Sequence, residues 1–306
     1  MGAEHAVAAV GPSDHDTSVV TAGKLVAMSP FVTTAWLAGR QNDPGVVILD
    51  ATLPPVGVTP SVDTRARYHA QHIPGAIFFD IEEHSDHSNS LPHMLPTPEV
   101  FSRSMSALGI GDSMAIILYE QEGVFSAPRA WWMLKTLGAQ SVYLLEGGLR
   151  AWIEAGLPTD SGEVYRAPAT FHARLDPNAV KDFSQVQQMI AAHAQILDAR
   201  SAGRFAGTSP EPRPGIRSGH MPGATSVPFT ELVEDGRLRS GEALRDLFAA
   251  KGVNREQPIT TTCGSGVTAA VVALALEVAG AKQVSLYDGS WAEYAAHPQA
   301  VIEKIT

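Results

Sequence analysis

The chain has 306 residues, of which 44% are hydrophobic and 18% are charged, and its formal net charge at pH 7 is -10. This length suggests about two globular domains, and the acidic balance gives no support for a nucleic-acid partner. The single cysteine excludes an internal disulfide and fits a reducing compartment, so a cytoplasmic protein is expected.

The first residues, 1–23, are expected to form a disordered extension. They are rich in Ala, Gly, Ser, Asp and His, and they lack the basic start and apolar core of a signal peptide. No apolar run in the chain approaches the length that crosses a bilayer, so no membrane association is predicted.

Residues 24–157 are expected to form a first α/β domain. β-branched and apolar runs predict buried strands, and they alternate with predicted helices. In chain order these elements are a helix at 33–37, a strand at 46–50, a helix at 98–108, a strand at 115–119, a helix at 130–134 and a strand at 142–145. Pro and Gly residues without periodicity then predict a linker over 158–178.

The second half, residues 179–306, repeats the order of the first. The segment 196–198 echoes 48–50, and 220–224 echoes 72–76 at the same offset along the chain. Two copies of one strand–helix–strand unit predict two tandem α/β domains, each a central, mostly parallel sheet flanked by helices.

The only cysteine lies in a short loop between a predicted strand at 258–262 and a predicted helix at 267–279. Glycines let successive N–H groups of this loop turn towards one centre, and the helix start adds free N–H groups. Such a cradle favours an anion, here a thiolate. A lone cysteine is more often a small apolar core residue. The strand–loop–helix setting nevertheless favours Cys263 as a nucleophile.

The first repeat differs at the equivalent position. There Glu120 follows the strand, as Cys263 does in the second repeat. A carboxylate cannot perform thiolate chemistry, so only the second domain is expected to be catalytic. The first domain is expected to act as a scaffold and as one wall of the cleft.

With these features the sequence resembles the tandem-domain rhodanese sulfurtransferases, and within them the 3-mercaptopyruvate sulfurtransferase branch. The resemblance covers nearly all of residues 24–295. Its most specific piece is the loop 263–268, because thiosulfate-preferring relatives usually place basic residues directly after the cysteine, where this chain has Gly264 and Ser265. Other family-like segments are 72–76, 126–132, 203–213 and 287–291.

The resemblance implies transfer of sulfur from 3-mercaptopyruvate to a thiol acceptor, such as thioredoxin or a small thiol, through a Cys263 persulfide. It implies no metal and no organic cofactor. The same chemistry with thiosulfate as donor is the nearest alternative, and a persulfide carrier or regulatory module without turnover is the non-enzymatic one. The loop residues that would contact the substrate are Gly264, Ser265, Gly266, Val267 and Thr268.

Two arginines, Arg204 and Arg213, lie in a Gly- and Pro-rich segment between two predicted strands. A planar guanidinium can bind a carboxylate through two hydrogen bonds. The arginines could instead form surface ion pairs with an acid such as Glu211. The resemblance implies that both hold the carboxylate and keto oxygen of the substrate.

The resemblance also implies a Ser–His–Asp relay, here Ser265, His72 and Asp63, reaching across the domain interface. The repeat of His72 at His220 leaves open a turn-stabilising role for both histidines. Asp63 could instead pair with a neighbouring arginine at the surface.

Three further histidines lie in a polar loop of the first half. They are His84, His87 and His93, and they have neither cysteine partners nor the helical spacing of zinc ligands. No metal site is predicted there.

Overall fold

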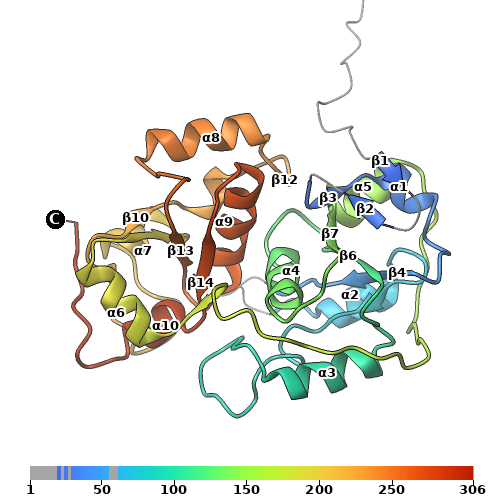
Figure 1. Cartoon of the computed structure of the whole chain (residues 1–306), viewed down its shortest axis with the longest axis horizontal. Coiled ribbons are helices and arrows are strands. Elements are labelled where there is room, and N and C mark those ends of the chain that lie inside the picture. The colour runs from blue at the N-terminus through green and yellow to red at the C-terminus, as the bar shows by residue number, and fades with distance from the viewer. Residues whose placement is uncertain (1–18, 22–23, 27–28, 55–60, 306) are drawn as a thin grey trace, which may run out of the picture.

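The computed structural model describes residues 19–21, 24–26, 29–54 and 61–305. Two five-stranded sheets, one in each half of the chain, carry helices on their faces (Figure 1). Every pair of neighbouring strands in these two sheets is parallel. The predicted α/β class with two tandem domains is therefore confirmed.

The first sheet has the strand order β3-β7-β6-β4-β5. Its long strands β4, β6 and β7 have the bounds that their apolar runs predict, and nearly all of their residues are buried because helices cover both faces. The strands are β3 (Phe31–Val32), β4 (Val46–Asp50), β5 (Ile77–Phe78), β6 (Ala115–Tyr119) and β7 (Val142–Leu145). The helices are α1 (Thr34–Ala38), α2 (Thr64–Ala70), α3 (Pro98–Ala107), α4 (Ala127–Thr136) and α5 (Gly148–Glu154).

The second sheet has the order β10-β9-β13-β14-β8, which is the first order read from the other edge. The two halves therefore share one topology, as the sequence repeat predicts. The strands are β8 (Val180–Lys181), β9 (Gln195–Asp198), β10 (Thr225–Ser226), β13 (Ile259–Thr262) and β14 (Val284–Tyr287). The helices are α6 (Phe183–Ala191), α7 (Ala202–Ala206), the 3-10 helix η1 (Phe229–Glu231), α8 (Gly241–Ala250), α9 (Val267–Val278) and α10 (Ser290–Tyr294), with a hairpin of β11 (Val233–Glu234) and β12 (Arg237–Leu238).

The N-terminal segment is described only in part. Residues 1–18 and 22–23 of the expected extension lie outside the described residues. Within it, Val19–Thr21 (β1) pairs antiparallel with Lys24–Val26 (β2). No helix in the part of the chain that the structure describes is both long and apolar enough to span a bilayer.

The expected linker, 158–178, contains no helix and no strand, only an isolated bridge at Asp160. It lies along the first domain, to which it is tied by backbone hydrogen bonds from Ala169 to Ser106 and from Arg174 to Leu137. Side-chain oxygens of the first domain accept further hydrogen bonds from its backbone.

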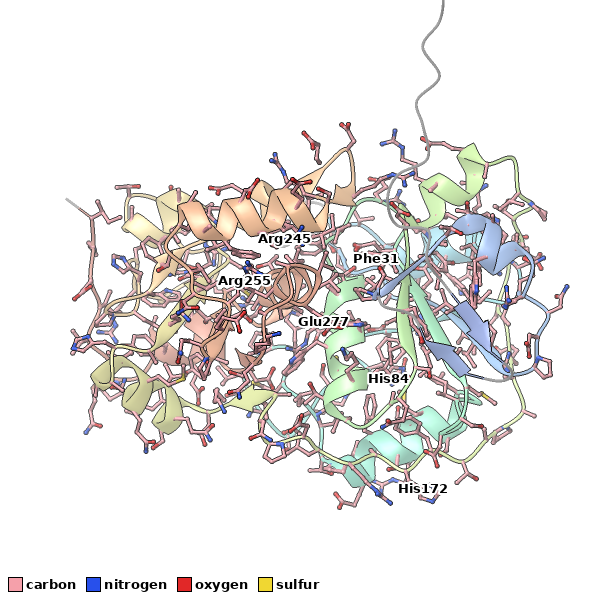
Figure 2. The ribbon with its side chains drawn as sticks, turned by 45° about the horizontal axis from the view of Figure 1, so that its top comes forward. Phe31, His84, His172, Arg245, Arg255 and Glu277 are labelled. Atoms are coloured by element: carbon pink, nitrogen blue, oxygen red, sulfur yellow. The ribbon has the colours of Figure 1, made fainter. Side chains whose placement is uncertain are left out.

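The two domains meet where α4 packs against α9. One cluster of buried apolar side chains is continuous across this contact and includes Trp131 and Leu134 of α4 and Leu274 of α9. Farther along the same two helices, Lys135 Nζ lies 2.7 Å from Glu277 Oε2. Figure 2 shows Glu277 at the boundary between the two halves. This packing brings the loops that precede α4 and α9 to the domain boundary.

Candidate active site

Cys263 directly follows β13, and its loop ends where α9 begins. Gly266, the residue before α9, has a left-handed backbone with a φ of 81°, and a Cβ there would lie 2.7 Å from Arg129 Nη1. A Cβ on Gly264 would lie 2.8 Å from Arg204 Nη2. Glycine is required at position 266 because the backbone is left-handed and a side chain would meet Arg129. At position 264 a side chain would meet the guanidinium of Arg204.

Hydrogen bonds fix Cys263 at the start of this loop, whereas the N–H groups that follow it have no acceptor in the described part of the chain. Cys263 N donates to Ser290 Oγ at 3.3 Å, and Cys263 O accepts from Trp291 N at 2.9 Å. The N–H groups from Gly264 to Thr268 donate to no other group among the described residues. They therefore remain available to an anion at the start of α9.

The equivalent loop of the first domain shows the same arrangement with its acceptor in place. Glu120 directly follows β6, and its carboxylate accepts from the N–H groups of Phe125 at 2.6 Å, Ser126 at 3.0 Å and Ala127 at 3.3 Å. Burial raises the pKa of Glu120, and these hydrogen bonds oppose that shift. A loop of this topology thus holds a carboxyl group where the second domain has its cysteine.

Cys263 lies at the wall of a cavity of about 680 Å³ between the two domains. The residue is only 2% exposed, so its sulfur can be approached from this cavity rather than from the open surface. The first domain contributes Leu53, Arg67, Glu120 and Phe125 to the walls, and the second contributes Arg204, Arg213, Phe229, Gly264, Ser265, Val267 and Thr268. Of the predicted loop residues, Gly266 alone does not line it.

The two predicted arginines both line this cavity. Arg204, on α7, donates from Nε at 3.1 Å and from Nη2 at 2.5 Å to Glu211 Oε2, so the ion pair considered as its alternative is present. That pair orients the guanidinium over Gly264 rather than removing it from the site. Arg213 makes no hydrogen bond or ion pair among the described residues. Both predicted arginines therefore lie at the cavity that contains the sulfur, which Arg67 and Arg200 line as well.

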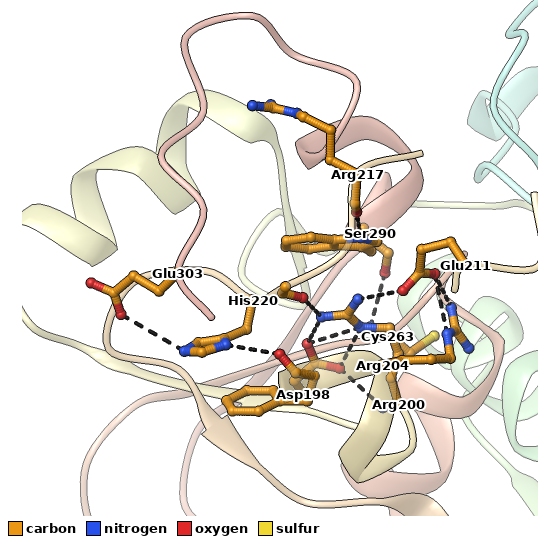
Figure 3. Close-up of polar contacts among 12 residues, drawn as sticks. Asp198, Arg200, Arg204, Glu211, Arg217, His220, Cys263, Ser290 and Glu303 are labelled. Atoms are coloured by element: carbon orange, nitrogen blue, oxygen red, sulfur yellow. Dashed lines mark hydrogen bonds and ion pairs between the residues drawn. The ribbon is translucent and has the colours of Figure 1, made fainter. Parts of the chain in front are cut away.

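A third arginine binds the other carboxylate oxygen of Glu211. The buried Arg200 donates to Glu211 Oε1 at 2.9 Å and forms a two-point ion pair with Asp198, as Figure 3 shows. Its guanidinium also stacks over the Trp291 ring, 4.1 Å from the centroid. Arg200 therefore has a structural role, and through Glu211 it fixes the position of Arg204.

The structure does not assemble the predicted relay of Ser265, His72 and Asp63. His72 is fully buried, its Nδ1 lies 2.8 Å from Tyr68 O, and its ring stacks on Tyr68. The Asp63 side chain caps α2 by accepting from Ala66 N at 2.9 Å. Ser265 lines the cavity, whereas neither His72 nor Asp63 does.

The second copy of the motif adopts the same arrangement. His220 Nδ1 lies 2.8 Å from Phe205 O, and its ring stacks on Phe205 with a centroid distance of 4.0 Å. Both histidines also form an isolated backbone bridge, His72 with Asp160 and His220 with Glu303. The turn-stabilising role left open for the pair fits both positions.

Another buried histidine pairs with an acid of its own loop and does not line the cavity. His93 is buried with a left-handed φ of 61°, and its Nδ1 lies 2.5 Å from Glu82 Oε1. The contact with His93 lowers the pKa of Glu82, with a smaller contribution from the charge of Arg213. Sequence reasoning considered His93 only as a metal ligand. The available signal was an acid and a histidine in one polar loop, which does not reveal their pairing.

The other two histidines of that loop are hydrogen-bonded elsewhere. His84 Nδ1 lies 2.7 Å from Ser104 Oγ, and His87 Nε2 lies 3.1 Å from Glu83 O. Within the described residues, no three His, Cys, Asp or Glu side chains gather as a group that could hold a metal ion.

Comparison with known proteins agrees with this architecture. The family model of the Rhodanese-like domain matches residues 33–155 and 182–297. The 3-mercaptopyruvate sulfurtransferase of Escherichia coli (strain K12) is 45% identical over 281 residues, which span 90% of this chain and 98% of that protein. The 3-mercaptopyruvate sulfurtransferase of Homo sapiens is 41% identical, over 92% of this chain and 96% of that protein.

Solved structures of the same fold are also similar to this chain. The crystal structure of SseA from Escherichia coli, described as a 3-mercaptopyruvate sulfotransferase of the rhodanese fold, has a TM-score of 0.80 and 43% identity over 86% of this chain and 99% of that one. A thiosulfate sulfurtransferase of Cricetulus griseus is also similar, at 39% identity over 86% of this chain and 91% of that protein. The chain belongs to the rhodanese family, with one rhodanese-like domain in each half.

Proposed function

We propose that the protein is a sulfurtransferase that moves sulfur from 3-mercaptopyruvate to a thiol through a Cys263 persulfide and releases pyruvate. The observation that carries this proposal is the arrangement around the sulfur. The N–H groups that follow Cys263 have no acceptor among the described residues, and Arg204 and Arg213 line the same cavity. The names of the two 3-mercaptopyruvate sulfurtransferases above support the choice of donor.

The two arginines suit a 2-keto acid. In our proposal one guanidinium binds the carboxylate through two hydrogen bonds and the other donates to the carbonyl oxygen. Arg204 is already oriented by Glu211, so little side-chain entropy is lost when the donor binds. The donor sulfur then lies towards Cys263.

The transfer itself is a displacement at sulfur. The Cys263 thiolate attacks the donor sulfur, a new S–S bond forms, and the C–S bond breaks with its electron pair moving onto the pyruvate enolate. A proton delivered to that enolate completes pyruvate. The loop N–H groups would stabilise the persulfide anion as they stabilise the thiolate.

Of the expected relay of Ser265, His72 and Asp63, only Ser265 lines the cavity. Ser265, on the cavity wall, would polarise the donor carbonyl.

The acceptor has to come from outside the chain. Cys263 is the only cysteine, so a second thiol, such as thioredoxin or a small thiol, would remove the outer sulfur, and cyanide would serve in vitro. This cycle needs a reduced cysteine, which fits a reducing compartment such as the cytoplasm.

Thiosulfate is the second candidate donor, because the related hamster enzyme carries that name and two arginines also suit a dianion. The test is kcat/KM for each donor with one acceptor. We expect a preference for 3-mercaptopyruvate, and a clear preference for thiosulfate would overturn our choice. A persulfide carrier would accept one sulfur from either donor without continuous turnover.

A further inference from the structure

Arg204, one of the two arginines assigned to the donor, belongs to a cluster of four charged side chains. It donates to Glu211 Oε2 at 2.5 Å, and Arg200 donates to Glu211 Oε1 at 2.9 Å. Arg200 also pairs with Asp198, with its Nη2 2.6 Å from Oδ2. Figure 3 shows these four residues together with Cys263. Two cations and two anions give the cluster a formal charge of zero, so Glu211 cancels the charge that Arg204 brings to the cavity.

Arg213, the other arginine assigned to the donor, has no ion pair among the described residues. The cluster and Arg213 together therefore carry one formal positive charge. A 2-keto acid donor carries one negative charge at pH 7, on its carboxylate, whereas thiosulfate carries two. The charge of the site thus matches a monoanion, and Glu211 reduces the advantage that two arginines would give to a dianion.

Glu211 can have this effect because it is shielded from water. Its side chain is 4% exposed, and the side chains of Arg200 and Asp198 are fully buried. Charges in such a place are screened much less than surface charges, so the loss of one changes the potential in the neighbouring cavity. The Arg204 guanidinium lies directly over Gly264, where a Cβ would be 2.8 Å from its Nη2.

The other acids near the donor site are exposed or are bound by their own loop. Glu122 and Asp235 line the cavity, Glu82 is near enough to Arg213 to interact with its charge, and all three are exposed. Water and salt screen such charges. Glu120 is buried, but its carboxylate accepts from the N–H groups of its own loop. The least screened charges that face the donor are therefore those of Arg213 and the four-residue cluster.

We propose that Glu211 is a specificity-determining residue that fits the donor site to monoanionic 2-keto thiols and disfavours dianionic donors such as thiosulfate. The inference rests on the function proposed above. Glu211 does not line the cavity, so it acts through its charge and through Arg204 rather than by contact with the donor. Charge and geometry can be separated, because Gln keeps the shape of Glu without its charge and Asp keeps the charge on a shorter side chain.

The test compares kcat/KM for thiosulfate and for 3-mercaptopyruvate, with cyanide as the acceptor for both. We expect Glu211→Gln to raise the ratio of thiosulfate to 3-mercaptopyruvate about 5- to 10-fold, because the added positive charge attracts the dianion more strongly. Glu211→Asp should leave the ratio within about 2-fold of the wild type, because the charge is kept. An unchanged ratio in Glu211→Gln, or an equal rise in Glu211→Asp, would overturn the proposal.

The matched control is Glu122→Gln, which removes the acid partner of another arginine on the same cavity, Arg67. Glu122 is 73% exposed, so its charge is screened. We expect this variant to leave the ratio within about 2-fold of the wild type. A rise equal to that of Glu211→Gln would show that any lost acid has the same effect, and the specific role of Glu211 would fail.

A second measurement probes the charge of the site without a sulfur donor. It compares alkylation of Cys263 by iodoacetate, a monoanion, with alkylation by neutral iodoacetamide, so that changes in thiolate reactivity cancel in the ratio of the two rates. Glu211→Gln should raise the ratio of iodoacetate to iodoacetamide about 5- to 10-fold, and an unchanged ratio would contradict the proposal. If the wild type takes sulfur from neither donor, the proposed function fails, whereas this ratio still decides whether Glu211 sets the charge.

The wild type decides the question if Glu211→Gln does not fold. Sulfate and methanesulfonate have similar tetrahedral shapes but carry two and one negative charges. We expect sulfate to compete with 3-mercaptopyruvate at most about 5-fold more strongly than methanesulfonate at the same ionic strength. A larger preference for sulfate would overturn the proposal.

Discussion

At the scale of single residues, Cys263 and Glu120 occupy equivalent positions with different chemistry. Each directly follows the central strand of its sheet and precedes the helix that packs at the domain interface. Glu120 fills its own cradle of N–H groups with its carboxylate, whereas the N–H groups after Cys263 have no acceptor among the described residues. The same loop geometry thus binds the Glu120 carboxylate in the first domain and, in our proposal, stabilises the Cys263 thiolate in the second.

The role of Arg213 is open to a direct test, because this side chain has no hydrogen bond or ion pair among the described residues that its removal would break. We expect Arg213→Ala to lower kcat/KM for 3-mercaptopyruvate about 30-fold, which corresponds to about 2 kcal/mol for a lost charge-assisted hydrogen bond. Sulfur removal by cyanide should be unaffected. Arg150→Ala, which removes an exposed arginine paired with Glu154, is the control. Equal effects of the two variants would argue against a carboxylate clamp.

A histidine substitution tests the predicted relay. His72→Gln should leave the rate of persulfide formation within about 2-fold and lower the free energy of unfolding, because His72 is buried against Tyr68. Stopped turnover in His72→Gln with an intact fold would restore the original relay.

His84 should make stability depend on pH. Burial lowers the pKa of His84, so the unfolded chain binds its proton more readily than the folded one. Its contribution is complete above the unfolded pKa of about 6.5 and is lost as the pH falls towards the lower folded value. Thermal unfolding between about pH 5 and pH 8 should show a fall in Tm on acidification that is smaller in His84→Asn. An unchanged slope in that variant would contradict this account.

At the scale of secondary-structure elements, the strand–loop–helix unit of β13 and α9 depends on two glycines for different reasons. Gly266→Ala places a Cβ on a left-handed residue and against Arg129, and we expect it to cost at least about 1 kcal/mol of stability. Gly264→Ala meets only the end of the Arg204 side chain. It should leave Tm nearly unchanged and raise KM for 3-mercaptopyruvate. Thermal unfolding and steady-state kinetics of both variants check this difference, and a large loss of stability in Gly264→Ala would contradict it.

The long buried strands were predictable from the sequence, whereas some short helices were not. β4, β6 and β7 were placed at their observed bounds because strands buried on both faces are continuous apolar runs. The short helices α2 and α7 were missed, because each is a single turn or two in a polar segment, where packing rather than periodicity decides the structure.

The candidate site was predictable to a similar extent. Cys263 and the two arginines come from local motifs, and the structure places all three on one cavity. The relay stays a prediction: among the described residues no hydrogen bond joins its members, because His72 folds into the same turn that His220 forms in the second domain. The pair of His93 and Glu82 forms only through the path of its loop, which no local pattern specifies.

At the scale of the whole molecule, the site exists because two domains of one topology pack through α4 and α9. The first domain contributes Phe125 and Arg67 to a cavity whose sulfur comes from the second. The buried ion pair of Arg129 and Asp288 crosses the same boundary.

The central claim is that Cys263 accepts one sulfur atom and passes it on, and intact-mass spectrometry tests it most directly. After incubation with 3-mercaptopyruvate and removal of the excess, the wild-type protein should gain the mass of one sulfur atom and lose it on addition of a thiol. Cys263→Ser should gain nothing. A wild-type protein that gains no sulfur, or a Cys263→Ser variant that gains the same mass, would contradict the account.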